Sequence, residues 1–181
     1  MKATRTLLAA MVLVTAIGAT SANAQCSGNA GTCNTTNTAS VTVGALVKLG
    51  MSGTTTALTA PTADDLDGGA AAVIANAGPS FTIKANRSWT LKIKSQNAAT
   101  WTYAGASAGV KPISDLAWST AVGGTFAAIS GSDATFLSGA SASNGTAAQA
   151  FFRTTWVNDF SDVSNREGTY TLPIVFTLTA P

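Results

Sequence analysis

The stretch Trp89-Thr90-Leu91-Lys92-Ile93-Lys94 alternates strictly between apolar and polar side chains. Side chains with a period of two lie on opposite faces of a β-strand, so this stretch predicts a strand with one buried face. The pattern recurs over 41–49, 81–85 and 170–179, and Gly-rich turn signals separate these stretches. Short alternating strands joined by such turns predict an all-β fold, an antiparallel β-sandwich of immunoglobulin-like architecture.

The apolar faces of these strands predict the core. Its expected members are Phe81, Ile83, Trp89, Leu91, Ile93, Tyr170, Leu172, Ile174 and Phe176. Residues 147–156 are ambiguous between helix and strand, but Phe152, Thr154 and Trp156 on one face favour a strand.

Register arguments apply to two places in the chain. If 81–85 and 89–94 are hairpin partners, a three-residue loop at Asn86-Arg87-Ser88 pairs Ala85 with Trp89 and keeps both apolar faces on one side. A bulge within one longer strand is the alternative. Pro173 lies inside the last alternating stretch, where it indicates an edge strand, a strand that crosses between sheets, or a bulge.

Residues 1–24 have the pattern of a secretory signal peptide. A positive start precedes an apolar run from Leu7 to Ile17, and Ala22-Asn23-Ala24 is a typical cleavage site. An amphipathic anchor that is retained is the alternative. We therefore expect an exported protein of the periplasm, cell surface or extracellular space, with a flexible leader over 25–38 and one β-sandwich domain over 39–181.

Cysteine and charge content agree with export. Cys26 and Cys33 are the only cysteines, and in an oxidising compartment we expect them to form a disulfide within the leader. Removal of 1–24 takes two of the ten basic residues, so eight positive charges face eight negative ones. A neutral chain predicts no nucleic-acid partner, and no apolar run after the signal is long enough to span a membrane.

The absence of histidine removes several catalytic chemistries. Neither a Ser-His-Asp triad nor a His-ligated zinc site is available, so we expect no enzyme and no cofactor. The alternative is a polysaccharide hydrolase that uses carboxylates among Asp64, Asp65, Asp67, Asp159 and Asp162. The cluster Asp64, Asp65 and Asp67 before Gly68-Gly69 is also a weak calcium candidate, although a solvated turn is the better explanation.

The aromatic residues suggest a ligand platform. Trp101 and Tyr103 alternate and therefore share a face, and Thr100 and Thr102 offer no competing buried face. An exposed pair of rings would stack on sugars, whereas core packing is the alternative that applies to the other tryptophans.

Two motifs resemble known families. Trp89-Thr90-Leu91 and the closing stretch Gly168-Thr169-Tyr170…Leu178-Thr179-Ala180-Pro181 resemble the bacterial WxL-type surface domains, although a second W-x-L is missing. That resemblance implies a secreted β-sandwich attached non-covalently to the cell wall. The alternating first and last strands more loosely resemble chaperone–usher fimbrial subunits.

Together these observations predict an exported cell-surface structural or adhesive protein without catalysis. Its expected partner is a cell-surface polymer or protein, and self-association through the N-terminal strand is a further expectation. A carbohydrate-binding module, a hydrolase, or a fimbrial-type subunit that assembles by donor-strand addition are the alternatives.

Overall fold

A computed structural model describes residues 37–181, of which residues 43–181 form one compact unit. The predicted signal peptide, the predicted Cys26–Cys33 disulfide and most of the predicted leader lie outside the described residues. Within residues 37–181, no helix is long and apolar enough to cross a bilayer.

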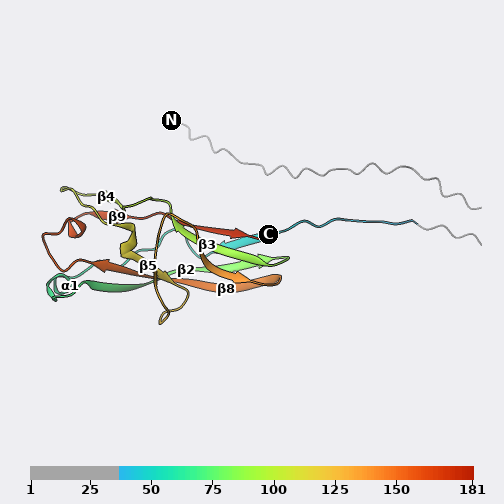
Figure 1. The fold of residues 1–181 in the computed structure, drawn as a ribbon, viewed down its shortest axis with the longest axis horizontal. Coiled ribbons are helices and arrows are strands. Elements are labelled where there is room, and N and C mark those ends of the chain that lie inside the picture. The colour runs from blue at the N-terminus through green and yellow to red at the C-terminus, as the bar shows by residue number, and fades with distance from the viewer. Residues whose placement is uncertain (1–36) are drawn as a thin grey trace, which may run out of the picture. The chain divides into compact units, whose positions relative to one another are not determined.

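The larger of the sheets has five antiparallel strands in the order β1-β2-β8-β5-β6. Figure 1 shows its strands β2 and β8 side by side. Two strands of 14 residues, β2 (Ala72–Ala85) and β8 (Ser143–Trp156), form its centre. Edge strand β1 (Val47–Met51) pairs with β2, and β5 (Leu116–Ser119) and β6 (Ala127–Ala128) continue the sheet beyond β8. The prediction that 147–156 is a strand is thereby confirmed.

A three-stranded antiparallel sheet has the order β10-β3-β7. Its strands are β10 (Ile174–Thr179), β3 (Trp89–Ser95) and β7 (Ala134–Gly139). A third pair joins β4 (Thr102–Ala104) to β9 (Thr169–Thr171). The helical elements are short: α1 (Ala63–Asp67) and the 3₁₀ turns η1 (Ile113–Asp115) and η2 (Val163–Asn165). The expectation of an all-β fold with antiparallel sheets is confirmed.

The two main sheets pack face to face through aromatic rings. The ring of Phe81 on β2 lies 5.6 Å from that of Phe136 on β7 and 4.5 Å from that of Phe176 on β10, measured between centroids. Five of the predicted core residues are buried: Phe81, Ile83, Trp89, Leu91 and Ile93. The other four, Tyr170, Leu172, Ile174 and Phe176, are half-buried against this cluster.

The predicted hairpin between 81–85 and 89–94 is wrong. Residues 81–85 end β2 in the five-stranded sheet, and 89–94 begin β3 in the three-stranded sheet, so Asn86-Arg87-Ser88 crosses from one sheet to the other. The requirement that Ile83 and Leu91 face the same core is still met, because the two sheets bury their inner faces against each other.

Pro173 marks the place where the chain changes sheets again. Residues 169–171 pair with β4, and residues 174–179 pair with β3. Proline cannot donate to a ladder, so the break falls where no backbone N–H is needed. The Pro173 carbonyl still accepts a hydrogen bond from the Gln96 N–H at 2.9 Å. Of the three possibilities at this proline, the crossing between sheets is observed, and β10, which follows it, is also an edge strand of its sheet.

Candidate functional site

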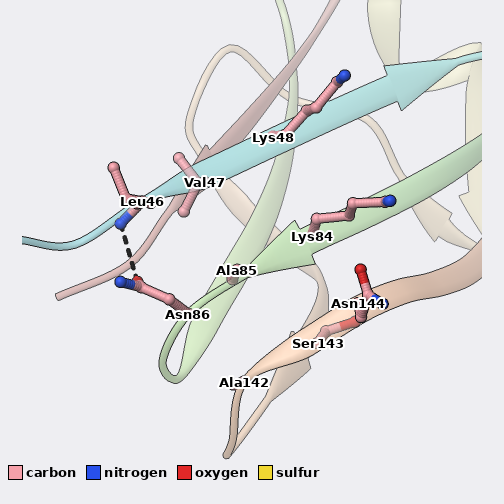
Figure 2. A pocket seen from close by; sticks show the side chains of 9 residues that line it. All are labelled: Leu46, Val47, Lys48, Lys84, Ala85, Asn86, Ala142, Ser143 and Asn144. Carbon is pink, nitrogen blue, oxygen red and sulfur yellow. Dashed lines mark hydrogen bonds between the residues drawn. The ribbon is translucent and has the colours of Figure 1, made fainter. Parts of the chain in front are cut away.

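A row of polar side chains crosses the outer face of the five-stranded sheet. Lys48 on β1 lies opposite Lys84 on β2, and Lys84 lies opposite Asn144 on β8, so the three side chains share one face. All three are exposed. We call them the basic row. They line a shallow hollow of about 490 Å³, and Figure 2 shows both lysine side chains extending in the same direction.

A β-bulge places Asn144 in this row. The register between β2 and β8 shifts between Ile83 and Lys84, and Gly145 has a φ of 133°, which favours glycine. The Ser143 hydroxyl accepts hydrogen bonds from the N–H groups of Gly145 and Thr146 and donates to the Ile83 carbonyl at 3.0 Å. The bulge is therefore tied to β2, and Asn144 is held beside Lys84.

The outer face of this sheet carries cations without acids. None of its five strands contains Asp or Glu. Among residues 37–181, neither Lys48 nor Lys84 has a carboxylate within ion-pair distance. The other sheet differs, because Lys94 and Lys92 on β3 lie 3.1 Å and 4.0 Å from Asp133. The lysines of the two sheets therefore differ in their partners: those of β3 lie beside the Asp133 carboxylate, and Lys48 and Lys84 have no such partner among residues 37–181.

Asn86 holds the chain that enters this sheet. Its backbone N–H donates to the Leu46 carbonyl at 3.2 Å, and its side-chain oxygen accepts from the Leu46 N–H at 2.9 Å (Figure 2). Its side-chain amide donates to the Gly44 carbonyl at 2.8 Å. The side chain of Asn86 thus extends the β1–β2 ladder toward the N-terminus. The residues just before β1 are therefore held against the end of β2.

A second hollow, a cleft of about 680 Å³, lies beneath residues 53–60. Its lining is largely aromatic and apolar and includes Trp101, Leu116, Phe152, Trp156 and Phe176. Leu58 packs against the core, and the Thr59 N–H donates to the Asn76 side chain at 2.7 Å. Residues 53–60 therefore cover an apolar space between the sheets.

The predicted platform of Trp101 and Tyr103 does not form. Trp101 is only 7% exposed, and its indole N–H donates to the Pro112 carbonyl at 3.0 Å. Tyr103 is half-buried: its ring lies 4.8 Å from that of Tyr170, and its hydroxyl donates to the Glu167 carbonyl at 2.6 Å. Core packing, the alternative reading of these rings, is the one observed for Trp101.

Lys111 is a buried cation at the edge of this cleft. Its ammonium donates to Asp115 at 3.0 Å and to the Thr155 carbonyl at 2.6 Å, and it lies 3.9 Å from the centre of the Trp156 ring. Burial lowers the pKa of Lys111 below its ordinary value, while the hydrogen bond and charge of Asp115 oppose this shift. Its donors are directed at protein groups, so Lys111 has a structural role.

Three of the five acidic residues singled out in the sequence, Asp65, Asp159 and Asp162, form hydrogen bonds with residues close to them in the sequence. Asp65 forms a capping box with Thr62 at the start of α1, and hydrogen bonds from Thr62 lower its pKa. Across residues 37–181, no group of three or more acidic or cysteine side chains is placed so that it could hold a metal ion. Hydrogen bonds from Ser161 and Ser164 lower the pKa values of Asp159 and Asp162, respectively.

The basic row was not among the residues expected to form a site. The alternation within 41–49 and 81–85 does place Lys48 and Lys84 on the polar faces of their strands. Their pairing was hidden because 81–85 was assigned to 89–94 as its partner. Each strand therefore showed its lysine on the polar face. Only the correct pairing of the strands shows that the two lysines lie opposite each other.

Comparison with known proteins finds no matching family model, no similar curated protein and no similar solved structure.

Proposed function

We propose that this chain is an exported, non-catalytic structural or adhesive protein of the cell surface, with an immunoglobulin-like sandwich as its body. One observation carries the proposal: the chain entering edge strand β1 exposes apolar side chains. Val43 is 66% exposed, Leu46 61% and Val47 45%. Apolar side chains along a sheet edge favour pairing with another chain, and soluble domains normally protect such edges.

The state of the carboxylates supports a non-catalytic role. A glycosidase needs one carboxylic acid with a raised pKa that protonates the leaving group. Asp159 and Asp162 instead have lowered pKa values, because serine residues of their own loop donate hydrogen bonds to them. Both are therefore ionised at neutral pH and suit a loop-stabilising role.

Self-association through the N-terminal segment is the form of assembly that the exposed residues favour. Strand β1 is already paired with β2 of its own chain, so it is not available for donation. The segment before it continues the apolar alternation, and Val41 is 87% exposed. We propose that residues 41–46 pair with an edge of a second copy, as a fimbrial-type subunit would by strand addition.

Sedimentation velocity over a concentration series tests this proposal on the chain comprising 25–181. We expect the wild type to associate and the double variant V41K/V43K to remain monomeric, with an unchanged thermal midpoint. The control is V110K/V122K, which places the same charges at two other exposed valines, 49% and 68% exposed. Monomers at every concentration, or equal loss in both variants, would contradict assembly through this segment.

Export has a separate test. Expression of the full chain followed by cell fractionation should place the protein outside the cytoplasm, shortened by 24 residues on intact mass. Full-length protein retained in the cytoplasm would contradict the proposed location.

A further inference from the structure

We propose that the basic row, Lys48, Lys84 and Asn144, binds an acidic polysaccharide through its carboxylate groups. The inference deepens the proposed surface function and rests on it, because it names the class of polymer that the domain holds. The observation that supports this inference is that two lysines lie directly opposite each other on a sheet face without acidic residues.

The first step concerns the cost of that arrangement. Like charges directly opposite each other on antiparallel strands destabilise the sheet. Lys48 and Lys84 are such a pair, and none of the five strands supplies a carboxylate to relieve them. The lysines of the other sheet share Asp133 instead. An anionic ligand placed between the two ammonium groups would supply the missing counter-charge.

The second step concerns the shape of the site. Adjacent strands are about 4.8 Å apart, so a row across three strands extends over roughly 10 Å. Asn144 continues the row with an amide that can both donate to and accept from hydroxyl groups. Thr82 and Gly50 form the next cross-strand pair on this face; Thr82 is exposed and Gly50, half-buried, has no side chain, so no large side chain stands beside the lysines in the path of an extended polymer.

The third step distinguishes a polysaccharide from a nucleic acid or polyphosphate. Phosphate polymers are densely charged and are bound by many cations, often with aromatic side chains that stack on bases. The row has two cations, and Arg153, the other cation of this sheet, has its guanidinium 3.9 Å from the centre of the Phe126 ring. Two charges beside an amide suit a polymer with widely spaced carboxylates and many hydroxyls.

The test measures binding of the chain 25–181 to polygalacturonate, with dextran as the uncharged polymer and polyphosphate as the phosphate polymer. The double variant K48Q/K84Q removes both positive charges of the basic row. The matched control K92Q/K94Q removes the same charge from the outer face of the other sheet. We expect polygalacturonate affinity to fall at least about tenfold in K48Q/K84Q, as for the loss of charge-assisted contacts, and to remain within about twofold in the control.

Stability measurements distinguish a loss of binding from a loss of folding. Removing one of two opposed charges should leave the thermal midpoint of K84Q equal to or slightly above that of the wild type, and 1 M salt should abolish any gain. A variant that is no less stable but binds less well has lost a binding group.

Four outcomes would overturn the inference: no binding of polygalacturonate, equal binding of dextran, equal weakening in both double variants, or tighter binding of polyphosphate than of polygalacturonate. Each leaves the proposed surface function standing if export and N-terminal association are observed. Conversely, a cytoplasmic, monomeric protein that still binds polygalacturonate through the row would refute the proposed function alone.

Discussion

Trp89 occupies space that only a glycine at position 139 leaves open. The two residues are cross-strand partners on β3 and β7, and a Cβ added at Gly139 would lie 2.5 Å from atoms of the indole ring. We predict that Gly139→Ala lowers the free energy of unfolding by about 1–3 kcal/mol, the usual cost of overpacking. Urea denaturation measures this. Gly123→Ala is the control, because nothing lies within 4 Å of its added methyl group, and equal effects in both variants would contradict the packing argument.

Lys111 gives stability a dependence on alkaline pH. Its pKa is lowered in the folded protein, mainly by desolvation, while the unfolded chain keeps the ordinary value of 10.5. Between these two pKa values the unfolded chain binds more protons, so the free energy of unfolding rises with pH. We predict that this rise is present in the wild type and missing in Lys111→Met. Urea midpoints measured from pH 7 to 10.5 test this, and parallel pH profiles for the two proteins would contradict it.

At the scale of elements, the Asn86 side chain determines how firmly the chain is held before β1. We predict that Asn86→Ala removes two hydrogen bonds, those to the Leu46 N–H and the Gly44 carbonyl, and leaves the body of the sheet intact. The Leu46 amide should exchange with deuterium faster, while amides of β3 keep wild-type rates. Hydrogen exchange resolved by residue measures both. Unchanged exchange at Leu46 would show that the backbone ladder alone fixes this segment.

The strands and their buried faces follow from the sequence, but their partners do not. Alternation identifies which side chains of 81–85 and 89–94 are buried, since that depends only on neighbouring residues. Pairing depends on contacts between distant segments: β2 pairs with β8, more than 50 residues away. The apolar faces of two successive strands can be buried in one core either when the strands form a hairpin or when the chain crosses to the opposite sheet. The loop Asn86-Arg87-Ser88 was compatible with both, and only long-range packing distinguishes them.

The same limit explains the outcome for the candidate sites. Trp101 and Tyr103 were considered as a platform because no local pattern buried them, yet Trp101 belongs to a buried cluster that includes Phe81 and Phe152, both distant from it in sequence. The basic row was missed for the converse reason. Lys48 and Lys84 are 36 positions apart, and their opposition exists only through the β1–β2 register.

For the whole molecule, net charge describes the outer face of the five-stranded sheet poorly. After residue 24 the chain is neutral, but its acids lie on α1, on η1 and in loops, while the outer face of the five-stranded sheet has only cations. Exposed charges farther apart than about 10 Å are largely screened at 0.1 M salt. A ligand at the basic row therefore meets a locally positive surface.

The positions where the chain enters β1 and leaves β10 determine how the domain responds to tension. Val47 lies opposite Ala85, and Thr179 lies opposite Thr90, so both points are at the end of the sandwich where the chain crosses between sheets; α1, β4 and β9 lie at the other end (Figure 1). Force between residues 46 and 180 pulls at two strand ends on the same side and opens their hydrogen bonds one after another. Force between residues 46 and 69 pulls β1 and β2 past each other and loads their hydrogen bonds together.

We therefore predict a lower rupture force for handles at 46 and 180 than for handles at 46 and 69 in single-molecule pulling experiments. Equal rupture forces would mean that the sheets separate before either strand peels. In this geometry, tension applied through residues 46 and 180 loads the domain in its weaker direction.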